Sequence, residues 1–494
     1  MGSLAGAPLL QFSRSVLFSC LGSSGGCKGV LQATSTLSRH LSGRQSQQHQ
    51  QQQAQQQYST IPDPDPAETQ LYAEQLQQPN FVHPVTITQL DNLCRQPTLQ
   101  RLVKSATFLK SQLPARLQNH VHRLQALPQP ANPQLQELLA STVRSKQRGL
   151  EVASDWKQQG TDDLAGLRHF ESHLATFREH LEVEVGKLTV NAQALTEGRG
   201  WWDNAQQVRW LNRMLDLCHW YLLSTRVMLT QHSAALAALQ ASSSSSSSSN
   251  PNPNAVLHYH EPGHKSTNPK QVYTPPHQQL AGSAATAVSL VRRQARVLDL
   301  TKLVAEDCRA FCVEKNSAAP DVQFVGGEGL TATLVVPYVE FLLTEVLKNA
   351  MQAVVSRYGA WEVDDAQPVL VEMQEIPGDS TTGSSSSSGG SSSSGSQIEI
   401  VVTDKGNGIP ADQAAHMYDY FWSNNRATNT LWVMLQQHYG YSRNHGSPFQ
   451  GIGVGVPMSR VYAHFMGGSI EWETDSWRRH TSVTIRLPKH GFTF

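Results

Sequence analysis

The stretch that decides the fold is PYVEFLLTEVLKNAMQAVV, residues 337–355, which has the pattern of a helix with one apolar face and one polar face. Its apolar stripe recurs every three or four residues and consists of Leu343, Val346, Leu347, Ala350 and Val354. On the polar side, Asn349 follows Glu345 by one turn, with Lys348 and Gln352 beside them. A carboxylate can accept a proton from a hydroxyl or a water, and an amide oxygen can ligate a hard cation. The same pattern also fits an ordinary helix whose polar face meets solvent.

Two glycine clusters lie further along the chain. The first, DKGNGIP at 404–410, follows the strand-like run IEIVVT at 398–403, and glycines at a strand's end let the backbone approach a ligand closely. The second, GIGVGVP at 451–457, opens a helical pattern at 458–465. The free N–H groups and positive dipole end of such a helix suit phosphate oxygens. Each cluster alone is equally compatible with a hairpin turn or a tight packing corner.

Taken in order, these motifs are specific: E-x-x-K-N-A on a helix, D-x-G-x-G after a strand, and G-x-G-x-G before a helix. The combination resembles the ATP-binding domain of the GHKL superfamily. That superfamily holds gyrase-type topoisomerases, heat-shock chaperones, mismatch-repair ATPases, bacterial histidine kinases and the mitochondrial protein kinases of 2-oxoacid dehydrogenases. No protein-kinase His-Arg-Asp or Asp-Phe-Gly motif and no Walker motif occurs in the sequence, which disfavours the other large ATP-using classes.

The N-terminal segment 1–62 has the composition of a transit peptide. It contains no Asp or Glu, while arginine and lysine are spread through Ser, Gly, Leu and Ala. The apolar patches are interrupted by Arg14 and by serines, so neither a secretory signal nor a membrane span is indicated. A disordered tail is the alternative, and composition does not separate a mitochondrial from a plastid address. The Gln-rich run 45–57 is low complexity and is expected to be unstructured.

Overall charge gives no sign of a nucleic-acid or membrane partner. Lys plus Arg and Asp plus Glu both number 39, so no bulk field attracts nucleic acid or an anionic membrane. The six cysteines form neither a disulfide framework nor a pair of zinc-type spacings, although Cys308 and Cys312 would share a helix face. We therefore expect buried free thiols in a reducing compartment.

Four helical stretches, at 99–128, 134–158, 162–192 and 204–239, are separated by breaks that contain proline or glycine. Long helices with short connections predict an antiparallel four-helix bundle, in which Pro114 should kink or reset the first helix. The predicted fold class is α+β, with the N-terminal antiparallel four-helix bundle followed by a GHKL-type α/β sandwich ATP-binding domain.

The predicted domain boundaries follow the low-complexity segments. They are 1–62 for the transit peptide and Gln-rich segment, 71–240 for the bundle, 241–285 for a low-complexity linker, and 286–494 for the ATP-binding domain. Within the last, a Ser- and Gly-rich insertion at 377–396 should form a long disordered hairpin loop. The linker contains His258, His260 and His264, for which a solvated loop is favoured over a metal site.

The order of the two domains selects among the branches of the superfamily. Gyrase-like and chaperone-like proteins begin with the nucleotide domain, whereas here it comes last. Bacterial histidine kinases also place it last, but the sequence lacks their phospho-accepting histidine followed by an acidic residue. In contrast, LPAR at 113–116 and Leu127-Pro128 resemble the first bundle helices of the mitochondrial 2-oxoacid dehydrogenase kinases, and Arg226 with Gln231-His232 resembles the end of their last bundle helix.

Within that family, the sequence resembles the branched-chain branch more than the pyruvate branch, which remains the alternative. The pyruvate branch usually carries a histidine where this chain has Phe341, and MYDY at 417–420 is closer to the branched-chain pattern. In three places the sequence departs from the pattern that both branches usually have. Gln352 and Lys405 replace arginines, and the final Gly-x-Gly-Thr-Asp motif is reduced to Thr481.

The resemblance implies a role for each motif in ATP-dependent serine phosphorylation. Glu345 would orient and deprotonate the substrate serine, Asn349 would hold Mg²⁺ between the phosphates, and Asp404 would accept the adenine amino group. The implied nucleotide-binding residues are Asn349, Asp404, Gly406, Gly408, Ser423, Asn424, Gly451, Gly453, Gly455, Val456 and Thr481. Their glycines would donate N–H groups to phosphate while a lid at 420–450 closes. Positioning and charge neutralisation are most of what phosphoryl transfer requires.

The resemblance also implies partners and a compartment. The substrate would be a serine of a 2-oxoacid dehydrogenase component, the bundle would bind the lipoyl domain of the acyltransferase core, and the kinase would be a homodimer in the mitochondrial matrix. Two other classes stay open. One is a GHKL ATPase machine in which Glu345 activates water, and the other is a non-catalytic nucleotide-binding scaffold, which Gln352 and the reduced terminal motif favour.

Overall fold

The computed structural model describes residues 82–156, 160–198, 200–244, 289–377, 395–422, 453–475 and 477–494. Several predictions fall on other residues. The transit peptide, the Gln-rich run, the three linker histidines and most of both low-complexity insertions lie outside the described residues.

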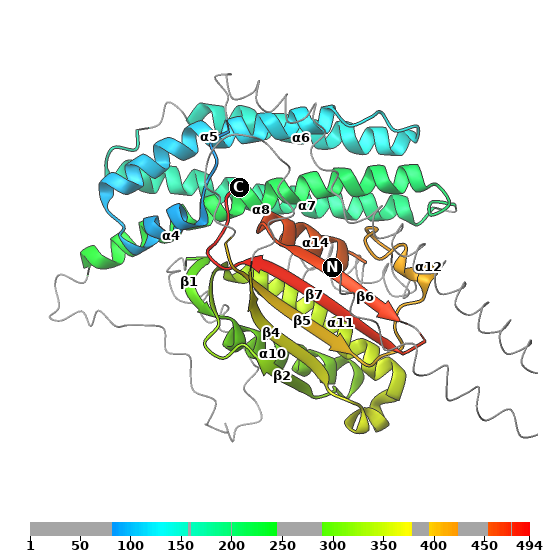
Figure 1. Ribbon diagram of the computed structural model, residues 1–494. Helices are drawn as coiled ribbons and strands as arrows, with labels where there is room; N and C mark the ends of the chain where they lie inside the picture. The colour runs from blue at the N-terminus through cyan, green and yellow to red at the C-terminus, as the bar shows by residue number, and fades with distance from the viewer. Residues whose placement is uncertain are drawn as a thin grey trace, which may run out of the picture. The chain divides into compact units, whose positions relative to one another are not determined.

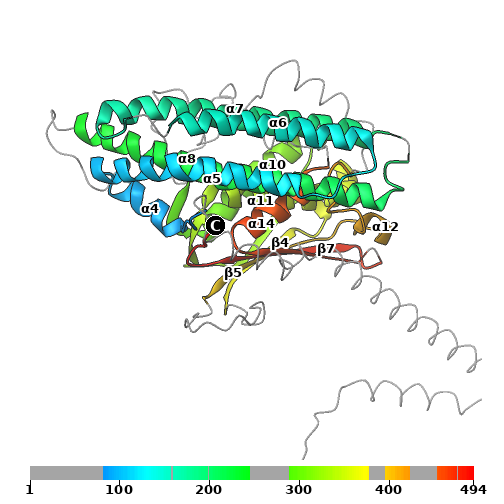
Figure 2. The same cartoon turned by 90° about the horizontal axis from the view of Figure 1, so that it is seen from above.

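The N-terminal part is helical. Its helices are α4 (Ile87–Arg95), α5 (Leu99–Gln125), α6 (Pro133–Asp155), α7 (Leu164–Thr196) and α8 (Ala205–Ser244). Each of the first four begins after a residue whose side chain accepts a hydrogen bond from a free N–H of the first turn, namely Thr86, Thr98, Asn132 and Asp163. The four long helices α5 to α8 form the predicted bundle (Figures 1 and 2).

Pro114 does not end the first bundle helix. Helix α5 runs from Leu99 to Gln125 with Pro114 inside it, between buried Leu113 and Leu117, and the kink expected there stays a prediction. Helix α4 was not predicted, although its sequence carries a signal. Thr86 and Gln89 form a capping box, each side chain accepting a hydrogen bond from the other's backbone N–H.

The C-terminal part is built on a five-stranded sheet with the order β2-β4-β5-β7-β6. Its strands are β2 (Val322–Gly326), β4 (Val369–Ile376), β5 (Gln397–Asp404), β6 (Ser469–Asp475) and β7 (His480–Pro488). Only the β2–β4 pair of this sheet is parallel. A separate antiparallel ribbon consists of β1 (Val291–Arg296) and β3 (Thr331–Val335). Strand-like runs at 369–374, 398–403 and 482–487 in the sequence predicted β4, β5 and β7, whereas the other strands were not anticipated.

Helices cover one face of the five-stranded sheet. They are α10 (Val297–Asn316), α11 (Val336–Glu362) and α14 (Gly455–Phe465), with the short elements η4 (Val363–Asp365) and α12 (Ala411–Ala414) near the sheet's edge. Figures 1 and 2 show α14 between the sheet and bundle helix α8, and α14 contacts both β6 and α8. The α+β architecture of a bundle followed by a sheet domain is confirmed.

The two parts share one apolar core and several backbone contacts. Buried Tyr338 of α11 donates a hydrogen bond to the carbonyl oxygen of Leu223 in α8 over 2.9 Å. The C-terminal segment pairs with the residues before α4, because Val85 and Phe494 exchange backbone hydrogen bonds of 2.9 and 3.0 Å. The sheet domain is therefore held against the bundle at more than one place.

The cysteine and membrane expectations can be compared with the described part of the chain. Cys218, Cys308 and Cys312 are buried free thiols and Cys94 is half-buried, and burial raises the pKa of the Cys94 thiol to about 11. Among the helices that the structure describes, none is both long and apolar enough to cross a membrane.

The core role of α11 gives a test of stability. Leu347 is fully buried in α11, whereas Leu99 at the start of α5 is 42% exposed. Replacing Leu347 with Ala should lower the free energy of unfolding by about 2 to 5 kcal/mol, because it removes buried methyl groups and leaves a cavity. The matched change Leu99→Ala should cost less than about 1 kcal/mol. Equilibrium denaturation with urea measures both, and equal losses would mean that α11 is not a core helix.

Candidate nucleotide-binding site

Helix α11 presents Glu345 and Lys348 as a buried ion pair. Their side chains are 4% and 7% exposed, and the Lys348 Nζ lies 2.6 Å from the Glu345 Oε2. The second carboxylate oxygen, Oε1, is also buried, and no described residue gives it a hydrogen bond. Leaving a buried acceptor unsatisfied costs about 1 to 3 kcal/mol. This oxygen is therefore positioned to accept a hydrogen bond or a proton from a molecule that enters the site.

The first residue of α14 packs directly on that carboxylate. A Cβ added to Gly455 would overlap the Glu345 Oε2 atom, so only glycine allows α14 to begin so close to α11. Residue Val454, which precedes the helix, makes no side-chain cap to it. In the part of the chain that the structure describes, no side chain accepts a hydrogen bond from the first N–H groups of α14, which begin beside the Glu345 carboxylate. Such an arrangement suits an anionic ligand.

Asn349 lies on α11 one turn after Glu345 and is half-buried. Among the described residues, no hydrogen bond to its side-chain amide is found. A free amide oxygen fits one position in the coordination shell of Mg²⁺, which keeps several waters and is usually completed by substrate phosphates. The described residues contain no cluster of three His, Cys, Asp or Glu side chains that could hold a metal by themselves.

Asp404 is the last residue of β5 and directly precedes the glycine-containing turn. Asp404 is 5% exposed, and its Oδ1 accepts a hydrogen bond of 2.8 Å from the backbone N–H of Gly406. The described residues offer no partner to the other oxygen, Oδ2. Burial raises the pKa of Asp404 to about 6, against the lowering effects of the Gly406 N–H and of Lys405. A carboxylate with a free oxygen in this position can accept a hydrogen bond from an amino group.

Two further contacts hold this turn against α11. A Cβ on Gly406 would overlap Ala353 of α11, and Arg357 one turn later donates from Nη1 to the carbonyl oxygens of Lys405 and Gly406 over 2.8 and 3.4 Å. Sequence reasoning missed Arg357. The signal was available, because Arg357 follows Glu345, Asn349 and Ala353 at steps of four residues on one helix face.

The remaining predicted residues divide into two groups. Thr481 of β7 is buried and directly opposite Asp404 in the β5–β7 pairing, and Gly408 follows the Asp404 turn with φ of +68°. Gly453 and Val456 lie on either side of Gly455 at the start of α14. Ser423, Asn424 and Gly451 lie outside the described residues, as does most of the predicted lid.

The structure therefore brings motif residues of α11 into contact with the β5 turn and with the start of α14. Residues 337–491 match the family model described as "Histidine kinase-, DNA gyrase B-, and HSP90-like ATPase". Residues 84–256 match the model described as "Mitochondrial branched-chain alpha-ketoacid dehydrogenase kinase". The chain belongs to the mitochondrial 2-oxoacid dehydrogenase kinase family of the GHKL superfamily, as its sequence predicted.

Several curated relatives are similar to this chain over part of its length. A mitochondrial [pyruvate dehydrogenase (acetyl-transferring)] kinase of Arabidopsis thaliana is 22% identical over 184 residues, which cover 37% of this chain and 44% of the relative. The protein of that name in Schizosaccharomyces pombe is 23% identical over 37% of this chain and 38% of the relative. The one in Drosophila melanogaster is 25% identical over 35% and 36%. The chain thus matches less than half the length of each of these relatives.

The raised pKa of Asp404 predicts a pH dependence of nucleotide binding. If only the carboxylate accepts the adenine amino group, about a quarter of the sites remain competent at pH 5.5, so affinity should fall about fourfold between pH 7.5 and 5.5. Calorimetric titration with ADP at several pH values measures this. The Asp404→Asn variant is the control for pH effects that come from protonation of the nucleotide itself. It should bind more weakly and lack the fourfold fall in affinity that comes from Asp404. Identical pH profiles for both proteins would contradict the role of Asp404.

The raised pKa of Asp404 has the opposite effect on the stability of the unliganded protein, which should increase as the pH falls. Because the pKa of Asp404 is higher in the folded protein than its ordinary value of 3.8, ionisation costs stability above pH 6 or so, and the cost is relieved as the pH falls from about 6 to about 4.

Proposed function

We propose that this protein is an ATP-dependent serine kinase that phosphorylates, and thereby inactivates, a mitochondrial 2-oxoacid dehydrogenase complex. The observation that carries the proposal is the unsatisfied Oε1 of Glu345 beside the uncapped start of α14. The reaction needs one group that binds the phosphates of the nucleotide and another that accepts the proton of the serine, and both must lie at one place. The start of α14 and Glu345 would supply these two groups, and they are in contact at Gly455.

In the proposed reaction, the adenine amino group binds Asp404 and the phosphates bind the first N–H groups of α14. Asn349 would hold Mg²⁺, which supplies charge neutralisation for the phosphates. Glu345 Oε1 accepts the proton of the substrate serine as its oxygen bonds to the γ-phosphorus. The bond from that phosphorus to the bridging oxygen breaks, and ADP leaves. Lys348 pairs with the other oxygen of Glu345 and so fixes the orientation of the carboxylate.

The branched-chain 2-oxoacid dehydrogenase is the favoured substrate, and the pyruvate dehydrogenase is the alternative. Phe341 lies one turn before Glu345, and its ring stacks on Tyr462 of α14 with centroids 4.3 Å apart. It therefore supplies packing where the pyruvate branch has an imidazole. The matched bundle model is described with the branched-chain complex and the relatives similar to this chain are named for pyruvate dehydrogenase, so the comparisons support a dehydrogenase kinase without favouring either substrate.

The proposal extends to partners and location by the family resemblance. The bundle would bind the lipoyl domain of the acyltransferase core, the kinase would act as a homodimer, and its compartment would be the mitochondrial matrix. The acid-free segment 1–62 and the word "mitochondrial" in the relatives' names support the compartment.

The central test replaces the proposed base. Glu345→Gln keeps the size of the side chain but loses the proton acceptor, so ATP should still bind while phosphate transfer to serine falls by about 10² to 10⁴. Transfer of labelled γ-phosphate is measured with each purified dehydrogenase complex, beside phosphate release without it. Glu362→Gln, at the exposed end of the same helix, is the matched control and should retain activity.

Three outcomes separate the classes of protein. Transfer by the wild type that is lost in Glu345→Gln supports the kinase, and the preferred complex identifies the substrate. Rapid phosphate release without transfer would indicate an ATPase machine. Tight nucleotide binding with neither activity would indicate a scaffold.

The compartment is tested separately. Residues 1–58 fused to a fluorescent protein should enter mitochondria, because an acid-free segment with dispersed basic residues has transit-peptide composition. The matched control carries Arg14, Arg39 and Arg44 changed to Glu and should stay in the cytosol. Import into plastids by the unmodified fusion would contradict the proposed compartment and substrate.

A further inference from the structure

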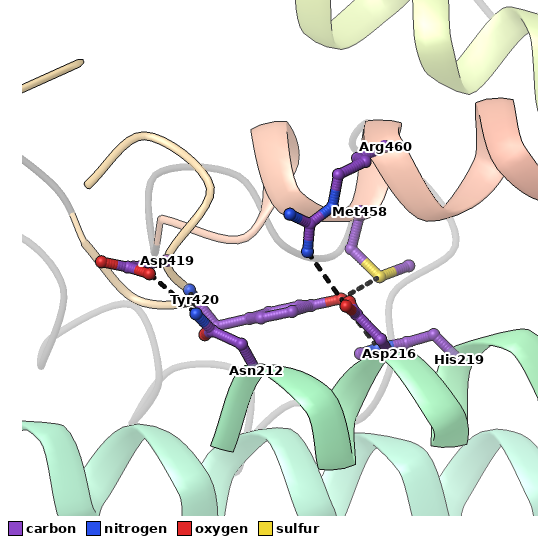
Figure 3. A network of polar contacts seen from close by, with 7 residues as sticks. All are labelled: Asn212, Asp216, His219, Asp419, Tyr420, Met458 and Arg460. Carbon is purple, nitrogen blue, oxygen red and sulfur yellow. Dashed lines mark hydrogen bonds and ion pairs between the residues drawn. The ribbon is translucent and has the colours of Figure 1, made fainter. Parts of the chain in front are cut away.

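A carboxylate of the bundle contacts two separate parts of the nucleotide domain. Asp216 of α8 accepts a hydrogen bond from the Tyr420 hydroxyl at Oδ1 and one from the Arg460 guanidinium at Oδ2, each 2.9 Å long. Figure 3 shows these side chains converging from three different segments. The Asp216 and Arg460 side chains are only 22% and 12% exposed, so solvent screens this ion pair incompletely.

Tyr420 is held on more than one side. It is 1% exposed, and its ring stacks on His219 of α8 with centroids 5.6 Å apart and an interplanar angle of 9°. Its hydroxyl lies 3.4 Å from the His219 Nδ1 and 3.9 Å from the Met458 sulfur in α14. The position of the ring and of the hydroxyl is therefore set jointly by α8 and α14.

One turn before Asp216, a second side chain of α8 holds the backbone at Tyr420. The Asn212 amide nitrogen donates to Asp419 Oδ1 over 2.7 Å, and its amide oxygen accepts from the Tyr420 N–H over 3.1 Å (Figure 3). The other oxygen of Asp419 pairs with His416 Nδ1 at 2.7 Å. The face of α8 that carries Asn212, Asp216 and His219 thus holds the Asp419 side chain and both the backbone and the side chain of Tyr420.

This anchored segment is directly joined to the glycine motif. Phe421 donates its backbone N–H to the carbonyl oxygen of Gly453 over 2.8 Å. A Cβ on Gly453 would overlap the carbonyl oxygen of Trp422, so the two segments are in backbone contact. Arg460 lies in the turn of α14 that follows Gly455. Asp216 therefore restrains the approach to α14 through Tyr420 and the helix itself through Arg460.

We infer that Asp216 is a positioning residue for nucleotide binding. From the bundle, it holds Tyr420 and Arg460 so that Gly453 and Gly455 stand in place to receive the phosphates. It touches no nucleotide itself. Glu345 limits the position of the same helix through Gly455, so α14 contacts a carboxylate of the bundle through Arg460 and one of α11 through Gly455. The inference rests on the proposed ATP site.

The inference has a reciprocal consequence. If the α8 contacts favour the binding-competent position of α14, bound nucleotide must favour the α8 contacts by the same free energy. Nucleotide should therefore slow amide hydrogen exchange in the middle of α8, around residues 212–219, although no residue there contacts it. An ordinary interface that only adds stability would give no such protection.

The test uses two variants of the full chain. Asp216→Asn removes the charge opposite Arg460, and Tyr420→Phe removes only the hydroxyl while keeping the ring that stacks on His219. Each should raise the dissociation constant of Mg²⁺-ADP and the KM for ATP about tenfold, with kcat at saturating ATP changed less than twofold. Tyr420→Phe keeps the test decisive should Asp216→Asn fail to fold.

A matched control removes a carboxylate from a bundle ion pair that lies apart from α14. Glu137 pairs with Arg144 within α6 at 2.6 Å, and Glu137→Gln should leave nucleotide affinity unchanged. Calorimetry measures affinity, and hydrogen exchange with and without Mg²⁺-ADP measures protection of α8. Protection in the wild type that is lost in Asp216→Asn supports the positioning role.

The failures are distinguishable. Wild-type affinity in both variants, or a loss of kcat with unchanged KM, would overturn the role of Asp216 and leave the proposed kinase intact. A wild type that binds no adenine nucleotide would overturn the proposed function and this inference together. Loss of affinity in Glu137→Gln as well would show a general effect of bundle charge and overturn the assignment to Asp216.

Discussion

The contact between Gly455 and the Glu345 carboxylate is the constraint on which the rest of the site depends. It places the start of α14 against the polar face of α11 so closely that any side chain at 455 would displace the Glu345 carboxylate. Both members of the adjacent Glu345–Lys348 ion pair are under a tenth exposed. Taking two charges out of water costs several kcal/mol per ion before their attraction is counted, and such a pair is weak evidence for stability. The unsatisfied Oε1 adds to that cost. An arrangement this expensive is better explained by chemistry at the carboxylate than by its contribution to the fold.

The same position of α14 connects the site to the bundle. Tyr338 joins α11 to α8 through its hydroxyl, and Arg460 joins α14 to α8 through Asp216. Because both helices that form the candidate site are fixed to one bundle helix, a shift of α8 would be transmitted to both walls of that site. The bundle is therefore mechanically connected to the proposed nucleotide site.

Sequence predicted the parts of the fold that have long, uninterrupted patterns. Helices α5 to α8 run for 27, 23, 33 and 40 residues, long enough for a helical period to stand out. Strand β1 could not be found in this way, because VRRQAR has only two apolar residues and its pairing with β3 supplies the order. Strand β2 is short and only half-buried, so its alternation is weak.

The candidate site also contains residues that the sequence predicted and residues that it missed. Glu345, Asn349 and Asp404 were predicted from local motifs, and in the structure the turn after Asp404 packs against α11, which carries the other two. Arg357 and Asp216 were missed because their partners are 48 or more residues away in sequence. No spacing rule links such positions. Only the packing of α11 on β5 and of α8 on α14 makes them neighbours.

The departures from the family pattern bear on whether the site can work. Gln352 and Lys405 replace arginines, yet Arg357 donates to the carbonyl oxygens of Lys405 and Gly406, so an arginine of α11 still holds the Asp404 turn. Thr481 retains a buried hydroxyl opposite Asp404. Its hydroxyl lies 3.4 Å from the Thr474 hydroxyl, and either of the two can be the donor. The Thr474 hydroxyl also accepts a hydrogen bond of 2.7 Å from the Ile409 N–H, which connects the pair to the turn. The proposed adenine-binding turn therefore keeps hydrogen-bonding groups despite the changed residues. The scaffold hypothesis drew its support from those changes. With the turn held by other means and a buried carboxylate oxygen left open for a proton, the geometry favours an active kinase over a scaffold.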